Sequence, residues 1–156
     1  MNIALFPGSF DPITIGHENI IRRALPLFDK LVVAVGSNTN KKHLFPLEQR
    51  TNWIKKVFED DPKIEVVSYD GLTVDFCKKI NATFIVRGLR NSSDYNYEST
   101  IAQMNHQLDN SIETLFLQTT PHLSAINSTI VRDIIIHKGD ASKFIPTAIK
   151  QGFIKK

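Results

Sequence analysis

Five short apolar runs recur along this chain of 156 residues, and they restrict its possible folds more than any other pattern in it. They are rich in β-branched residues, and several are apolar without alternation, which is typical of strands covered on both faces of a sheet. The predicted strands are Ile3–Phe6, Leu31–Val35, Ile64–Val67, Phe84–Val86 and Leu115–Leu117.

The segments between these runs show the periodicity of amphipathic helices. One helix is predicted to follow the first run, and a short one is predicted after Pro146. The longer helical patterns span Leu47–Phe58, Leu72–Ile80, Asp94–Leu108 and Ser128–His137. Strands that alternate with helices predict an α/β fold: a Rossmann-like, doubly wound, five-stranded parallel sheet with helices on both faces. No linker or repeat interrupts the pattern, so residues 1–156 are expected to form a single domain.

Composition excludes several classes of protein. The net charge of +3 suits an anionic ligand, but no long basic block or alternation of basic and aromatic residues indicates nucleic-acid binding. The single cysteine, Cys77, forms neither a disulfide within the chain nor a zinc cluster, and its helical surroundings predict a buried structural thiol. The sequence shows the pattern of neither a signal peptide nor a membrane-spanning run, so we expect a cytoplasmic protein that does not bind membranes.

In parallel sheets of this kind, ligands bind beyond the carboxyl ends of the strands. Four chemically suited segments are predicted to follow strands: Gly8–His17, the pair Lys41-Lys42, Arg87–Arg90 and Thr119–Thr129. All four segments carry basic or imidazole side chains, and Thr119–Thr129 is also rich in hydroxyl groups. Together they predict a site for a ligand with several phosphates.

The segment Gly8–His17 joins the first strand to a helix whose first turn contains His17. Free backbone amides at such a helix start bind anions. Thr14 and His17 are three residues apart, so both are expected to point at one ligand. Because the helix dipole disfavours protonation there, His17 is predicted to be a neutral N–H donor to phosphate.

The other three segments allow both a functional and a structural interpretation. Arg87 and Arg90 suit bidentate phosphate binding or a loop salt bridge, and Glu98 could orient an arginine or accept from a ribose hydroxyl. The Lys41-Lys42 pair either reaches a phosphate or is solvated. Residues 124–129 either bind phosphate oxygens at a second helix start or only cap that helix.

Other nucleotide-binding motifs are missing. The chain has no Gly-x-x-x-x-Gly-Lys-Ser/Thr loop, no Gly-x-Gly-x-x-Gly and no nucleophilic serine elbow. The remaining histidines lack the spacing of a metal site, so no protein-bound metal is predicted.

Taken together, these motifs resemble the nucleotidyltransferase superfamily with the Thr/His-x-Gly-His signature, and within it the bacterial phosphopantetheine adenylyltransferase family. The resemblance runs nearly end to end. It is carried by Pro7–Thr14 with Gly16-His17, Leu47-Glu48 with Arg50, Arg87–Arg90 with Asp94, Tyr97-Glu98, and Met104-Asn105.

The resemblance implies transfer of AMP from ATP to 4′-phosphopantetheine, giving dephospho-coenzyme A and pyrophosphate. It implies catalytic roles for His17, Lys41 and Arg90, with His17 stabilising charge at the transferred phosphorus. The ATP-binding residues that it implies are Ser9, Phe10, His17, Gly88, Leu89, Arg90, Glu98, Leu123, Ser124, Ala125, Ile126, Asn127, Ser128 and Thr129. The acceptor-binding residues that it implies are Ser9, Lys41, Thr73 and Arg87.

One segment departs from the family pattern. The family pattern has two aromatic residues here, followed by three serines. In this chain Leu123 and Ala125 replace the two aromatic residues, and Asn127 and Thr129 replace the first and third serines. The loss of aromatic surface implies weaker packing on adenine, by about 0.5–1.5 kcal/mol.

The resemblance further implies Mg²⁺ bound through the ATP phosphates, a homohexamer, and dephospho-coenzyme A or coenzyme A as product or feedback ligand. Three other functions stay open on the sequence: transfer of a nucleotidyl group to a different phosphate, such as a sugar phosphate or nicotinamide mononucleotide; nucleotide binding without catalysis; and RNA binding.

Overall fold

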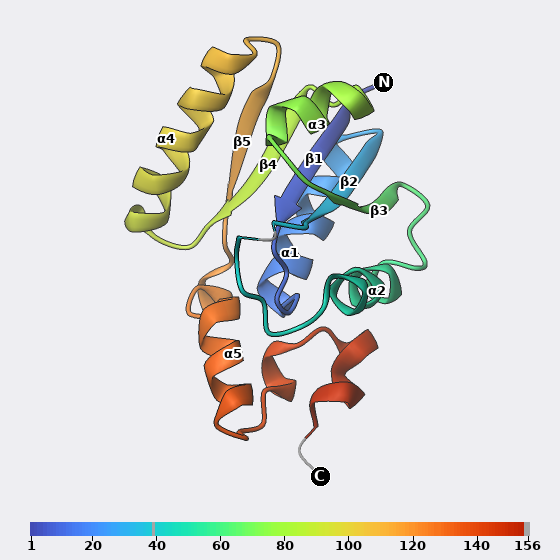
Figure 1. The fold of residues 1–156 in the computed structure, drawn as a ribbon, viewed down its shortest axis with the longest axis vertical. Coiled ribbons are helices and arrows are strands. Elements are labelled where there is room, and N and C mark those ends of the chain that lie inside the picture. The colour runs from blue at the N-terminus through green and yellow to red at the C-terminus, as the bar shows by residue number, and fades with distance from the viewer. Residues whose placement is uncertain (39, 155–156) are drawn as a thin grey trace.

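The computed structural model describes residues 1–38 and 40–154 of the chain. These residues contain one sheet of five parallel strands in the order β3-β2-β1-β4-β5 (Figure 1). The strands are β1 (Ile3–Gly8), β2 (Lys30–Gly36), β3 (Ile64–Tyr69), β4 (Phe84–Leu89) and β5 (Glu113–Gln118). The predicted α/β class with a five-stranded parallel sheet is confirmed.

The helices are α1 (Ile15–Ala24), α2 (Leu47–Val57), α3 (Thr73–Ile80), α4 (Ser92–Leu108) and α5 (Ser128–Ile136). Helix α4 begins two residues before the predicted start because the side chain of Asn91 caps it, accepting a hydrogen bond from the Asp94 backbone amide. The segment after Pro146 forms a 3₁₀ turn, Thr147–Phe153, and not an α-helix. Shorter 3₁₀ turns lie at Leu25–Leu27, Pro121–Leu123 and Ser142–Phe144.

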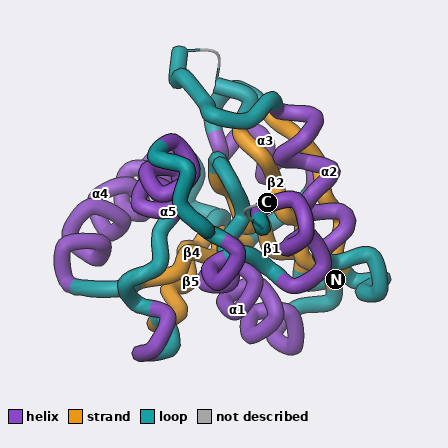
Figure 2. Tube along the Cα trace, turned by 90° about the horizontal axis from the view of Figure 1, so that it is seen from below, coloured by secondary structure: helices purple, strands orange, loops and turns teal. Residues whose placement is uncertain are grey.

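Both faces of the sheet are buried, and this explains why the apolar runs do not alternate with polar residues. Ala4, Phe6 and Val33 point into the larger core cluster, which contains residues of α1, α2, α5 and the C-terminal turns. Their strand neighbours Leu5 and Val32 point into a smaller cluster, which contains residues of α3. Figures 1 and 2 show α2 beside β2 and β3, and α4 beside β4 and β5.

Cys77 lies in the smaller cluster and is fully buried, as predicted. Burial raises the pKa of its thiol to about 11, and the negative charge of Asp109 acts in the same direction. The thiolate is therefore scarce at neutral pH, and Cys77 is a packing residue.

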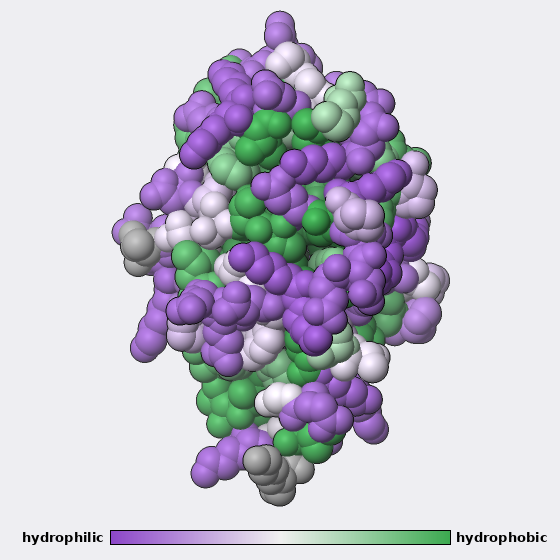
Figure 3. Space-filling model, turned by 90° about the vertical axis from the view of Figure 1, so that its right-hand side faces the viewer, coloured by the Kyte–Doolittle hydropathy of each residue, from purple (hydrophilic) through white to green (hydrophobic). Residues whose placement is uncertain are grey.

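Hydrophilic side chains cover much of the face drawn in Figure 3, with apolar side chains exposed between them. Edge strand β3 carries a charged side chain, Glu65, that pairs with Lys30 of β2. Within the described ranges, no helix is long and apolar enough to cross a membrane.

The strand order reverses between β1 and β4, which is where a parallel sheet forms its ligand crevice. Strands β1 and β4 pair only at Ala4–Phe84 and Leu5–Ile85, whereas β1 and β2 pair along six positions. Beyond Leu5 the two central strands therefore separate. Their carboxyl ends, Gly8 and Leu89, leave a gap at the centre of the sheet.

Candidate active site

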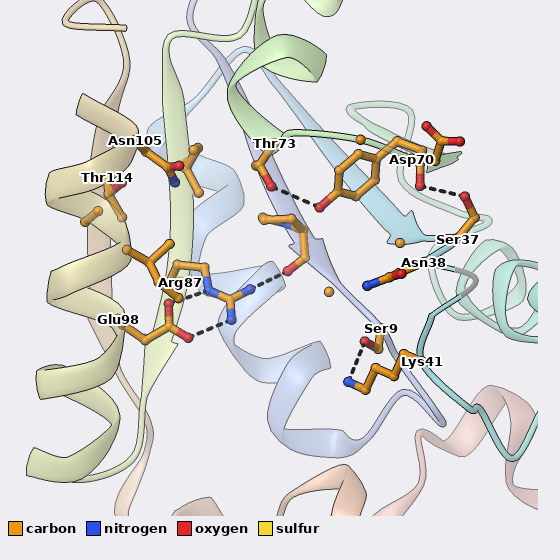
Figure 4. A pocket seen from close by; sticks show the side chains of 18 of the residues that line it. Ser9, Ser37, Asn38, Lys41, Asp70, Thr73, Arg87, Glu98, Asn105 and Thr114 are labelled. Atoms are coloured by element: carbon orange, nitrogen blue, oxygen red, sulfur yellow. Dashed lines mark hydrogen bonds and ion pairs between the residues drawn. The ribbon is translucent and has the colours of Figure 1, made fainter. Parts of the chain in front are cut away.

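Two adjoining cavities occupy this end of the sheet. The larger, of about 690 Å³, extends toward α3 and α4, and Figure 4 shows it from close by. The smaller, of about 290 Å³, lies against the starts of α1 and α5. Six residues line both cavities and so form their common wall: Pro7, Gly8, Ser9, Lys41, Arg87 and Glu98.

His17 lines the smaller cavity from the first turn of α1. Its Nδ1 accepts a hydrogen bond of 3.0 Å from the backbone amide of Thr14, so the ring carries its proton on Nε2. Burial lowers the pKa of His17 to about 4, and the positive charges of Arg87 and Arg90 act in the same direction. A neutral imidazole with one N–H donor is thus the stable form at physiological pH.

Thr14 lines the smaller cavity together with His17, and it has a second role. It is 1% exposed and is the N-cap of α1, where its Oγ1 accepts from the His17 backbone amide and lies 3.2 Å from His17 Nδ1. Thr14 therefore also fixes the orientation of the imidazole.

The lowered pKa of His17 predicts that the stability of the fold depends on pH. Unfolded His17 has its ordinary pKa of 6.5, so between pH 6.5 and about 4 the unfolded chain binds more protons than the folded chain. The stabilisation is complete above pH 6.5 and is lost as the pH falls through about 4. Urea unfolding of the wild type and of His17→Gln should therefore show their difference in free energy falling by about 1–3 kcal/mol over this window. A difference that does not change with pH would show that His17 titrates normally.

Arg87 lies within β4, not in a loop after it, because β4 continues through Leu89. Its Nε and Nη2 donate to the two carboxylate oxygens of Glu98 at 2.9 and 2.7 Å, and its Nη1 donates to the carbonyl of Pro7 (Figure 4). The guanidinium thus bridges the gap between β1 and β4. Glu98 orients this arginine, and the salt bridge considered from the sequence is present at the wall between the cavities.

Arg90 is held in a similar way by Asp94, in the first turn of α4. Its Nε and Nη2 donate to Asp94 at 3.0 and 3.1 Å, and its backbone amide donates to the same carboxylate at 2.9 Å. Both arginines therefore have defined orientations before any phosphate arrives. Arg90 lines the smaller cavity, beside His17.

Lys41 and Ser9 meet on the common wall. The Lys41 ammonium donates to Ser9 Oγ at 3.2 Å, and both residues line both cavities. Lys42 lines neither. Thr73 lines the larger cavity from the start of α3, and its hydroxyl lies 3.2 Å from that of Tyr69.

Only part of the segment that was expected to bind ATP at the second helix start reaches the smaller cavity. Among the residues that line this cavity are Ile126, Asn127, Ser128 and Thr129, and Phe10 and Gly88 line it as well. Asn127 is the N-cap of α5 and accepts from the Ile130 backbone amide at 2.9 Å, a role that asparagine fills as well as serine. Neither cavity is lined by Leu89, Leu123, Ser124 or Ala125.

Several residues of the site were not anticipated from the sequence. Arg132 lines the smaller cavity, where its Nη1 donates to the Asp11 carbonyl at 2.9 Å. Its spacing of four residues from Ser128 on a predicted helix was a usable signal, because such residues share a helix face. Asp11, Arg50 and Asn105 are among the residues that carry the family resemblance, but the sequence assigned them no role. For Asp11 and Arg50 this is because partners such as Leu44 and Ser9 lie far away in the sequence.

No group of three or more metal-ligating side chains (His, Cys, Asp or Glu) comes together within the described residues. The carboxylates that line the smaller cavity have partners: Glu98 and Asp94 hold arginines, and Asp11 accepts from two backbone amides. Asp70 lines the larger cavity.

Comparison with known proteins gives a consistent result. The model of the cytidylyltransferase-like family matches residues 5–134. In fold, the chain is similar to a bifunctional NMN adenylyltransferase/ADP ribose pyrophosphatase from Francisella tularensis, with a TM-score of 0.73 and 18% identity over 94% of this chain and 45% of that one. The fold and the matched family therefore define a nucleotidyltransferase.

Sequence relatives narrow this class. The chain is 51% identical to a phosphopantetheine adenylyltransferase from Flavobacterium psychrophilum, over 96% of this chain and 99% of the relative. It is 47% identical to one from Lachnoclostridium phytofermentans, over 97% of this chain and 93% of the relative. The chain belongs to the phosphopantetheine adenylyltransferase family.

Proposed function

We propose that this chain transfers AMP from ATP to 4′-phosphopantetheine, forming dephospho-coenzyme A and pyrophosphate in coenzyme A biosynthesis. The observation that carries the proposal is the pair of cavities that share a wall of Ser9, Lys41 and Arg87, in a member of this family. Such an arrangement suits two phosphate-bearing substrates that react with each other at the wall.

The smaller cavity is the proposed ATP subsite. Two helix starts supply backbone amides there, and Arg90 adds a positive charge near His17. Gly16 lies between the two helix starts: a Cβ at this position would be 3.4 Å from Thr14 Oγ1 and 3.8 Å from the Ile126 carbonyl oxygen, both ordinary contact distances. The resemblance implies an ATP-binding role for residues 123–129. We propose this role for Ile126–Thr129, because these four residues line the smaller cavity.

The larger cavity is the proposed acceptor subsite. Its size suits an elongated substrate, with the phosphate beside Arg87, Lys41 and Ser9 and the pantetheine arm directed toward Thr73 and Asn105 (Figure 4). Glu98 belongs to both cavities and is proposed to hold Arg87 for the acceptor while contacting the nucleotide.

The chemical step needs no general base, because the attacking oxygen belongs to an ionised phosphate. That oxygen forms a bond to the α-phosphorus, the bond to the bridging oxygen breaks, and pyrophosphate leaves with the electron pair. His17 donates its Nε2–H to the α-phosphate, where negative charge increases in the transition state. Lys41 and Arg90 neutralise charge on the two flanking phosphates, and alignment provides much of the remaining acceleration.

Mg²⁺ is proposed to accompany ATP. Because the carboxylates of the smaller cavity are occupied by arginines and backbone amides, this subsite fits a cation whose ligands come mainly from phosphate oxygens and water. When bound, the cation would neutralise phosphate charge. Orientation of the substrates would still depend on the residues described above.

The assembled state is proposed to be a homohexamer, as the family resemblance implies. Helix α4 has no buried residue, and one stripe of it exposes Tyr97, Ile101, Met104 and Leu108. A continuous apolar stripe of this kind is typical of a face that another subunit covers. We further propose that residues 1–156 act as one domain, that the protein is cytoplasmic, and that dephospho-coenzyme A or coenzyme A binds as product or feedback ligand.

An assay of pyrophosphate release tests the activity. Purified protein with ATP and Mg²⁺ should release pyrophosphate when 4′-phosphopantetheine is added, and the nucleotide product should be dephospho-coenzyme A by mass. Nicotinamide mononucleotide and a sugar phosphate serve as control acceptors. Turnover of a control acceptor in place of 4′-phosphopantetheine would move the function to another nucleotidyltransferase. ATP binding with no turnover of any acceptor would indicate a binding module.

A further inference from the structure

Arg50, on the second turn of α2, is a buried cation that connects three separate segments of the chain. It is 2% exposed. Its Nη1 donates to the Ser9 carbonyl at 2.7 Å and to the Gly36 carbonyl at 3.4 Å, and its Nε donates to the Phe45 carbonyl at 3.0 Å. One guanidinium thus ties the loop after β1, the end of β2 and the start of α2 together.

Asp11 holds the same region from the opposite side. It is 2% exposed, and its carboxylate accepts from the backbone amides of Leu44 at 2.8 Å and of Phe45 at 2.9 Å. Phe45 is therefore held at its amide by Asp11 and at its carbonyl by Arg50. A buried charge is costly unless it is compensated. The Asp11 carboxylate is compensated by these two amides and by Arg132, whose Nη1 lies 4.0 Å from it, and Arg50 is compensated by three carbonyls.

The side chain of Phe45 anchors the segment a third time. Its ring packs edge-on against Trp53 with 4.7 Å between centroids, and it lies 6.1 Å from the ring of Phe153. The backbone at 44–45 is therefore fixed to α2, to the C-terminal turn and to the loop after β1.

The fixed segment follows directly after Lys41. The Lys41 side chain is long, exposed and flexible, and in this structure its ammonium reaches Ser9 Oγ at 3.2 Å. Arg50 and Asp11 fix the backbone near the two residues of this contact. Arg50 binds the carbonyl of Ser9, and Asp11 binds the amide of Leu44, three residues after Lys41. The pair therefore determines where a lysine on a loop can place its charge.

We propose that Arg50 and Asp11 are positioning residues for the transfer step, which act by placing Lys41 and Ser9 at the wall between the two substrate subsites. Neither touches the reacting phosphates. The inference rests on the proposed adenylyl transfer. Beyond that function, we infer that the contribution of Lys41 to turnover depends on the hydrogen bonds that Arg50 and Asp11 make to the backbone. Displacement of a catalytic group by about 1 Å can cost about 100-fold in rate.

A double-mutant cycle tests the proposal. Arg50→Lys retains the charge but loses the planar fork that reaches three carbonyls. It should lower kcat by about 10–100-fold in the wild type. In the Lys41→Ala background it should lower kcat by less than about threefold, because Lys41, the charged group of the two that it positions, is already missing. Lys55→Ala, an exposed cation on the same helix, is the matched control and should leave kcat unchanged.

Thermal unfolding is measured on all four proteins of the cycle, because a structural role would lower Tm without coupling to Lys41. Equal losses of kcat in both backgrounds, or no loss in the wild type, would overturn the proposal. The same cycle is repeated with Asp11→Asn, which preserves the volume of the side chain. The proposal can then still be tested if Arg50→Lys does not fold. An inactive wild type would count against the proposed function itself, and so would be recognised separately.

Discussion

His17→Ala is expected to lower kcat by about 10²–10³-fold while the protein stays folded. The expectation rests on the tautomer. Nδ1 is occupied by the amide of Thr14, so the only N–H of the ring is the Nε2–H. With a pKa lowered to about 4, the ring keeps this form over the whole physiological range. The residue can therefore donate a hydrogen bond to the α-phosphate without transferring a proton.

The measurement is kcat at saturating ATP and 4′-phosphopantetheine, with the KM of each substrate determined separately. A donor used mainly in the transition state should change kcat more than either KM. His122→Ala, at an exposed position, serves as the control and should behave as wild type. If kcat of His17→Ala stays within about threefold of the wild-type value, the motif around His17 has only the structural role of starting helix α1.

The fold could be predicted from the sequence because its signals are local. An apolar run such as that in β2 needs burial on both faces, and Thr14 marks the start of α1 by its side-chain chemistry alone. The ends of the strands are predicted less accurately. The sequence places Arg87 after β4, although it lies within this strand, because a charged residue at the end of an apolar run indicates a loop unless its partner in the fold is known.

The partners of the site could not be predicted, because they depend on how distant segments align in space. Glu98 lies 11 residues from Arg87, and Ser9 lies 41 residues from Arg50. No periodicity links such pairs. Arg50 illustrates the difficulty: in the sequence it is one more polar residue on an amphipathic helix, and only the sheet order brings three carbonyls to its guanidinium.

Arg87→Ala is expected to lower kcat/KM for 4′-phosphopantetheine by about 30- to 1000-fold, or about 2–4 kcal/mol. Three effects add. The acceptor phosphate loses a cationic partner, and Glu98, which is 12% exposed at its side chain, is left as an uncompensated anion beside two phosphates. The bridge from Arg87 to the Pro7 carbonyl is lost as well, so the gap between β1 and β4 is no longer spanned.

The double variant Arg87→Ala/Glu98→Gln separates these effects. If repulsion by Glu98 contributes, the double variant should recover about tenfold of the lost kcat/KM, whereas loss of the phosphate contact alone would leave it unchanged. Arg22→Ala is the matched control, because Arg22 pairs with Glu18 on the exposed side of α1 and such pairs contribute at most about 1 kcal/mol. The KM values decide the subsite. A rise confined to the KM of ATP would place Arg87 with the nucleotide, and the proposed division of the two cavities would then be wrong.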